Sequence, residues 1–139
     1  MDIFSPNELE QIAKILGGAA TARELHNFLE NAQIEFVSQE STKWRFLKDC
    51  FIEDQKTYAC WNHILTFIQL VLDPIRFTEN SLQFEDLRLQ LNNVLRFKGI
   101  EYTKEKQFRQ TPSVRSLDDL PKIWRTRLVN RDVLFHVLT

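Results

Sequence analysis

The sequence is poor in glycine, with three in 139 residues, and it lacks any long apolar run. So few glycines exclude most phosphate-cradling loops, and neither a P-loop, nor Gly-x-Gly-x-x-Gly, nor the hydrolase motif Gly-x-Ser-x-Gly is present. The longest mainly apolar stretch, residues 61–72, contains four polar residues and is too short to span a bilayer. The first ten residues are acidic and polar, so no secretory signal is expected. The sequence therefore predicts neither a membrane protein nor a nucleotide-binding loop.

Cysteine and histidine are also scarce. Cys50 and Cys60 are the two cysteines, and each lies among apolar residues. This pattern is typical of buried, reduced thiols, so we predict a cytoplasmic protein, with a single disulfide as the alternative. His26, His63 and His136 lie far apart, and none begins a ligand spacing such as His-x3-His. We therefore predict no metal site and no cofactor.

Local signals predict a mainly α-helical protein of about six helices. Ser5 with Glu8, and Thr21 with Glu24, have the spacing of capping boxes and precede apolar residues at helical intervals. Residues 1–33 are accordingly expected to form a helical hairpin. Further helices are predicted over residues 41–51, 57–72 and 82–97, and after residue 116. Their apolar faces predict the following core: Trp44, Trp61, Ile64, Leu65, Ile68, Phe84, Leu87, Leu91, Leu95 and Trp124.

The apolar period changes from 3.6 to 2 residues after Gly99, which is a helix stop. Ile100 and Tyr102 alternate with polar residues, and Phe108 does the same a few positions later. The pattern predicts a small β-hairpin between the fifth and sixth helices, with residues 104–106 as its loop.

A series of motifs runs along the chain in a fixed order: Thr42-Lys43-Trp44-Arg45-x-Leu47, Phe67-Ile68, Asp73-Pro74-x-Arg76-Phe77, and Phe84-x-x-Leu87-Arg88-x-x-Leu91-Asn92-x-Val94-Leu95-x-Phe97-x-Gly99. Together these motifs resemble the N-terminal domain of bacterial and prophage proteins of the Ymh-type hypothetical family, which is similar to AbiJ-like abortive-infection proteins. The resemblance extends over about residues 9–135. It implies a helical domain that usually precedes a second domain resembling a HEPN-type effector.

That effector domain has no counterpart in this sequence, so we expect the chain to be either a truncated or a stand-alone version. A single helical domain is predicted over residues 1–139. Residues 1–129 should form its core, and residues 130–139 should be a tail or a junction to the missing domain.

Charge is distributed unevenly along the chain. Residues 1–95 carry eight basic and fourteen acidic side chains, whereas residues 96–131 carry ten basic and four acidic ones. The basic segment is open to three interpretations: a solvated face, a surface for a protein partner or a second copy of the chain, or a surface for nucleic acid. The candidate binding residues are Lys98, Lys104, Lys106, Arg109 and Arg115.

One pattern near the carboxyl terminus is enzyme-like. Residues 131–136 resemble the Arg-[Asn/Asp/His]-x3-His motif of HEPN ribonucleases. In such a site His136 would act as general base and Arg131 would stabilise developing phosphate charge. We interpret this match as a coincidence and predict a non-catalytic sensing or interaction module of a bacterial antiphage system, bound to a protein partner or effector domain. Nucleic-acid binding and ribonuclease activity are the alternatives.

Overall fold

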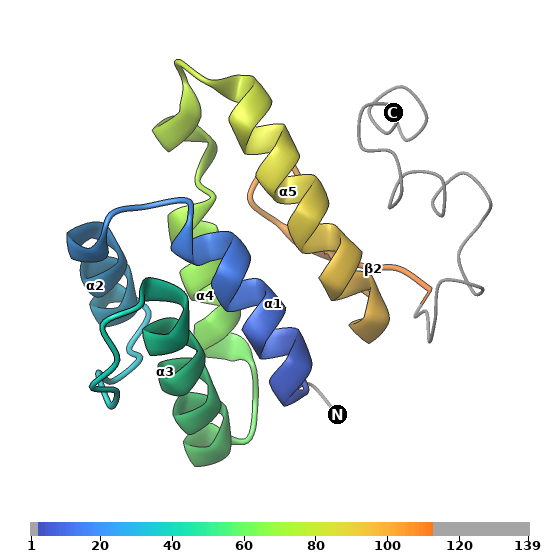
Figure 1. Ribbon diagram of the computed structural model, residues 1–139. Coiled ribbons are helices and arrows are strands. Elements are labelled where there is room, and N and C mark those ends of the chain that lie inside the picture. The colour runs from blue at the N-terminus through green and yellow to red at the C-terminus, as the bar shows by residue number, and fades with distance from the viewer. Residues whose placement is uncertain (1–2, 113–139) are drawn as a thin grey trace.

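Five α-helices and one β-hairpin form the part of the chain that the computed structural model describes, residues 3–112 (Figure 1). The helices are α1 (Pro6–Gly17), α2 (Ala22–Asn31), α3 (Lys43–Tyr58), α4 (Asn62–Val71) and α5 (Ser81–Leu95), and two 3₁₀ turns, η1 (Pro74–Phe77) and η2 (Arg96–Lys98), flank α5. Strands β1 (Ile100–Tyr102) and β2 (Phe108–Gln110) pair antiparallel. The prediction of a mainly helical fold with a hairpin after the fifth helix is confirmed. The predicted sixth helix, with Trp124, lies outside the described residues.

Both predicted capping boxes are present. The Ser5 hydroxyl accepts from the Glu8 N–H at 3.2 Å, and the Glu8 carboxylate accepts from the Ser5 N–H at 2.8 Å. Thr21 and Glu24 repeat this arrangement at 3.2 and 2.9 Å. The expected helical hairpin is nevertheless wrong, because α1 packs mainly against α3 and α5, whereas α2 packs against α4. Figure 1 shows α1 lying between α3 and α5.

The boundary between the third and fourth helices differs from the prediction. Helix α3 continues to Tyr58, seven residues beyond the predicted end at 51, and α4 begins only at Asn62. Ala59 ends α3 with a left-handed φ of 55°, and its N–H donates to the carbonyl of Gln55 at 2.8 Å. This geometry usually requires glycine. The sequence carries no glycine or proline here, which explains the misplaced boundary.

A buried amide holds the amino-terminal segment to α3. The side-chain oxygen of Gln55 accepts from the N–H of Phe4 at 2.8 Å, and its NH₂ group donates to the carbonyl of Phe4 at 2.7 Å. The Phe4 ring is buried and lies 4.8 Å from the ring of Trp61. The segment before α1 is thus part of the core.

One cluster of buried apolar side chains includes members from every helix and from the hairpin. The predicted core residues that are buried are Ile64, Ile68, Phe84, Leu87, Leu91 and Leu95. Trp44, Trp61 and Leu65 are only partly buried and pack against the outside of this cluster. Large indole rings are seldom fully enclosed, so two of these three exceptions have a simple reason. Within residues 3–112 no helix combines the length and apolar character of a membrane span.

Replacing Ile68 with aspartate should unfold or strongly destabilise the protein, because Ile68 is 0% exposed. We expect the free energy of unfolding to fall by at least about 4 kcal/mol, since an unpaired carboxylate would be placed in the core. Urea denaturation followed by circular dichroism measures this loss. The matched control is Thr66→Asp on the exposed side of α4, which should change stability by less than about 0.5 kcal/mol. A cooperative Ile68→Asp protein with the wild-type midpoint would contradict the placement of α4.

Candidate functional site

The β-hairpin contains most of the described candidate residues, and short-range interactions form it. Gly99 has a left-handed φ of 75° and separates the helical region from β1. The loop closes where the Thr103 N–H donates to the carbonyl of Gln107 at 2.8 Å, and Lys106 adopts a φ of 65°. The Thr103 hydroxyl also accepts from the Gln107 N–H at 3.1 Å. A threonine side chain therefore stabilises this turn, which lacks the common Asn-Gly pair.

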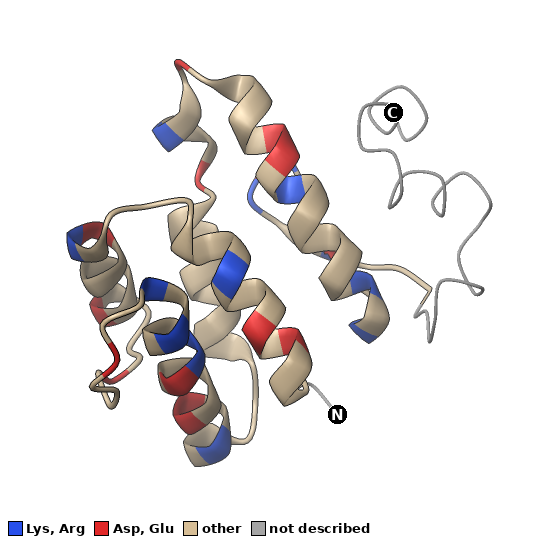
Figure 2. Ribbon diagram, viewed as in Figure 1, with Lys and Arg blue, Asp and Glu red and all other residues tan. Residues whose placement is uncertain are grey.

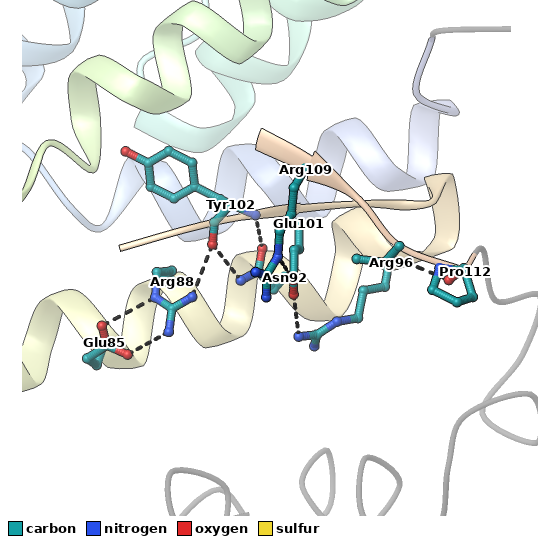
Figure 3. A network of polar contacts seen from close by, with 9 residues as sticks. Glu85, Arg88, Asn92, Arg96, Glu101, Tyr102, Arg109 and Pro112 are labelled. Atoms are coloured by element: carbon teal, nitrogen blue, oxygen red, sulfur yellow. Dashed lines mark hydrogen bonds and ion pairs between the residues drawn. The ribbon is translucent and has the colours of Figure 1, made fainter. Parts of the chain in front are cut away.

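Asn92 holds β1 against α5, as Figure 3 shows. Its NH₂ group donates to the carbonyl of Tyr102 at 3.0 Å, and its side-chain oxygen accepts from the Tyr102 N–H at 2.7 Å. Arg88, one turn earlier, donates to the same carbonyl at 3.1 Å and is held by Glu85 at 2.8 Å. The amide thus substitutes for a neighbouring strand and satisfies backbone groups that are buried with it.

Tyr102 links the hairpin to α4. Its hydroxyl donates to the carbonyl of Leu72 at 2.7 Å, one of the acceptors left free at the end of a helix. Burial, and to a smaller extent the charge of Asp73, raises the pKa of Tyr102, so the phenol remains protonated. Gln69, also on α4, donates to the carbonyl of Lys106 at 2.7 Å. Strand β1 is therefore attached to α5 and to the end of α4, and the hairpin loop is attached to α4.

Glu101 lies between two arginines in the middle of β1 (Figure 3). Its carboxylate accepts from Arg96 at 3.0 Å and contacts Arg109 through the other oxygen, and its side chain is 10% exposed. Burial by itself would raise the pKa of Glu101, but hydrogen bonds from Arg109 and Arg96 outweigh it and hold the pKa below its usual range. The simple alternation of polar residues in β1 suggests a solvent-facing glutamate, which this structure does not have.

Carboxylates from distant parts of the chain neutralise two lysines of the predicted basic surface. The Lys98 ammonium lies 3.5 Å from the Glu8 carboxylate at the start of α1. The Lys106 ammonium lies 3.0 Å from Asp73, which precedes η1. In Figure 2, basic residues at the end of α5 and acidic residues on α1 lie on neighbouring helices. The two oppositely charged parts of the sequence therefore meet in the fold.

The other candidate residues differ in their environment. Arg109 contacts Glu101, as described above, whereas Lys104 is exposed and forms no ion pair with any residue in 3–112. Arg115, Arg131 and His136 lie outside the described residues. The hairpin therefore brings together Lys104, Lys106 and Arg109, but only Lys104 has no carboxylate partner in the described part of the chain.

A second polar cluster, which the sequence analysis missed, contains Asp54 and His63. The Asp54 side chain is 2% exposed, and one of its oxygens lies 2.9 Å from Nδ1 of His63. Burial raises the pKa of Asp54, and the hydrogen bond with His63 opposes that rise. Its other oxygen, Oδ2, is buried without a hydrogen-bond partner among the described residues. The available signal was its position: Asp54 continues the buried stripe of α3 that contains Leu47 and Cys50.

The neighbouring thiol of Cys50 is not suited to act as a nucleophile. It is buried, and burial raises its pKa more than the backbone N–H groups of Val37 and Ser38 lower it. Within residues 3–112, no group of three or more histidine, cysteine or carboxylate side chains could hold a metal ion.

A scan against models of protein families finds no match, and searches of curated proteins and of solved structures find no significant relative. The resemblance to abortive-infection proteins thus stays a prediction that rests on the sequence motifs.

Replacing Glu101 with glutamine should destabilise the protein by about 3 kcal/mol at pH 7, because it removes the charge that compensates buried Arg96. The pKa of Glu101 is lowered in the folded state, so its stabilisation is complete above the unfolded value of about 4.3 and disappears as the pH falls through the folded pKa. The stability difference between the two proteins should therefore shrink in acid, as guanidinium titrations at several pH values would measure.

The control is Glu105→Gln in the exposed hairpin loop, which should leave stability unchanged at each pH. Equal stability of wild type and Glu101→Gln at pH 7 would contradict the role given to this carboxylate.

Proposed function

We propose that this protein is a non-catalytic sensing or interaction module of a bacterial antiphage system of the abortive-infection type, and that it acts by binding a protein partner or effector domain. The observation that most supports a protein partner is that basic residues of the predicted binding surface form ion pairs with carboxylates of the same chain. Lys98, Lys106 and Arg109 each contact a carboxylate of the same chain, so these cations are already neutralised. The antiphage setting rests on the resemblance of the motifs alone.

Exposed apolar side chains provide a second argument for a protein partner. Phe36, Val37 and Tyr58 are 48%, 44% and 52% exposed. Val37 and Tyr58 line the same cavity, and Phe36 lies between two residues that line it. Aromatic and aliphatic groups gathered in this way are typical of the centre of protein interfaces.

The polar network of the hairpin has a structural role. Asn92, Arg88 and Gln69 all direct their donors to backbone carbonyls of the hairpin. Tyr102 directs its hydroxyl to the end of α4. These groups stabilise the attachment of the hairpin and support a rigid module.

Affinity purification from bacteria before and after phage infection tests the proposal. We expect the wild-type chain to recover a defined protein partner, and Val37→Asp combined with Tyr58→Ala to reduce that recovery at least about tenfold, as expected for an interface centre. Leu82→Ser is the matched control, because Leu82 is equally apolar and 76% exposed on another part of the surface. A purified chain that turns over RNA, DNA or nucleotides at enzyme-like rates, with no partner present, would contradict the proposal.

Nucleic-acid binding has its own signature. If the hairpin binds phosphates, its affinity for nucleic acid should fall steeply as the salt concentration rises. Lys104→Ala should then reduce the slope of the logarithm of the binding constant against the logarithm of the salt concentration by about one unit. We expect instead no retardation of RNA or DNA in a mobility-shift titration at about 150 mM salt, where even non-specific binders retain measurable affinity. Salt-dependent retardation weakened by Lys104→Ala would favour the basic surface. Metal-independent RNA cleavage lost in His136→Ala would favour the ribonuclease alternative.

A further inference from the structure

A small cavity of about 40 Å³ lies between α3 and the segment that precedes it. It is lined by Glu35, Val37, Cys50, Glu53, Asp54, Thr57 and Tyr58. Three of these side chains are carboxylic acids, and the lining contains no lysine or arginine. A volume of this size accommodates a group as large as one or two water molecules, such as a primary ammonium.

Asp54 gives this cavity a specific chemical requirement. One oxygen of the buried carboxylate is engaged by His63 at 2.9 Å, whereas Oδ2 has no hydrogen-bond partner among the described residues. Buried polar atoms are nearly always hydrogen-bonded in native proteins, and an exception points to a bound group or a functional role. Asp54 lines the cavity, and Oδ2 itself is covered, so a donor that enters from outside the chain completes the hydrogen bonding of this carboxylate after a small shift of the side chains around it.

The charge around the cavity selects a cationic donor. Figure 2 shows lysine and arginine on the first turns of α3, acidic residues on the turns that follow, where Glu53 and Asp54 lie, and one more basic residue, Lys56, on the last turn. Lys56 is exposed and does not line the cavity. Glu35 approaches from the preceding segment, and its charge is close enough to Asp54 to raise the pKa of that carboxyl. A neutral donor would satisfy Oδ2 but would leave the repulsion between these acids uncompensated.

One part of the rim of the cavity is apolar and exposed. Val37 and Tyr58 lie on it, and the Tyr58 ring packs edge-on against His63 with a centroid distance of 4.7 Å. Phe36 lies next to Val37, and its ring contacts those of His26 and Phe46 at 5.0 and 6.0 Å. Exposed apolar side chains beside a buried acceptor are a feature of interface hot spots, because a partner that packs on them excludes water from the polar contact on that side.

We propose that this cavity receives a lysine side chain of a protein partner, whose ammonium donates to Asp54 while apolar residues beside the lysine pack on Val37 and Tyr58. Glu35 and Glu53 supply further negative charge at the entrance. The small volume favours an ammonium over the larger guanidinium of arginine. This inference rests on the proposed function and deepens it, since it names the chemistry that the partner presents.

A peptide titration monitored by ¹H–¹⁵N NMR tests the inference. The probe is acetyl-Leu-Lys-Leu-amide, and the matched peptides replace its lysine with norleucine or arginine. We expect the lysine peptide to shift the amide signals of Val37, Asp54 and Tyr58, with a Kd of about 1 mM, as is reasonable for a single anchor. Asp54→Asn should weaken this binding at least about tenfold, a difference of about 1.4 kcal/mol. The control Glu79→Gln, exposed and distant in sequence, should leave it unchanged.

Asp54→Asn keeps an oxygen that can accept from His63, so the variant should fold, and its thermal transition checks this. If it does not fold, the Glu35→Gln/Glu53→Gln double variant replaces it, with the same expected loss of affinity. The inference is overturned if the lysine peptide produces no shifts at about 10 mM, ten times the expected Kd. Equal binding of the norleucine peptide would show an apolar patch only, and equal binding of the arginine peptide would remove the size argument. Each of these results overturns the lysine assignment.

The failure of this inference is distinguishable from the failure of the proposed function. If the full chain recovers a protein partner and Asp54→Asn recovers it equally well, the lysine site is wrong but the interaction module stands. If no protein partner exists, the purification experiment fails whatever the peptides do.

Discussion

The pair of hydrogen bonds between Asn92 and the backbone of Tyr102 joins the β-hairpin to α5 and so positions the charged residues of the hairpin. A hairpin with three-residue strands is not stable alone in water. Here α5 supplies hydrogen bonds to the edge of β1 that does not pair with β2, and the hydroxyl of Tyr102 connects the same strand to the end of α4. The burial of Glu101 follows from this attachment, because it places the middle of β1 beside Arg96.

Pairing between oppositely charged regions decides what the surface presents. The Lys98–Glu8 and Lys106–Asp73 pairs join the end of the described chain to α1 and to the start of η1. Such partly exposed pairs each contribute about 0–1 kcal/mol, so their effect on stability is small. Their effect on recognition is larger, because a lysine already held by a carboxylate is a weaker phosphate ligand. The acidic cavity near Asp54 has no comparable cation among its lining residues.

The parts of the fold that were correctly predicted depend on interactions between near neighbours in the sequence. The capping boxes of α1 and α2 each join residues three positions apart. Gly99 marks the end of the helical region because a left-handed φ is easiest for glycine, and the hairpin follows from the change of period after it. The end of α3 was missed because an alanine, Ala59, takes the left-handed position. The packing partners of α1 and α2 were missed because both helices have one apolar face and the pattern does not say which helix covers it.

The sequence by itself therefore determined the presence of the five described helices, the hairpin, and six of the nine predicted core residues that the structure describes, since local geometry and apolar period depend on short segments. Only the tertiary structure decided which charges meet, because Glu8 and Lys98 are ninety positions apart and nothing in their local sequence links them. It also decided that Glu101 is buried and that the unpartnered oxygen of Asp54 belongs to a residue lining a cavity. These properties arise from desolvation and from contacts between distant segments, and neither exists until the chain has folded.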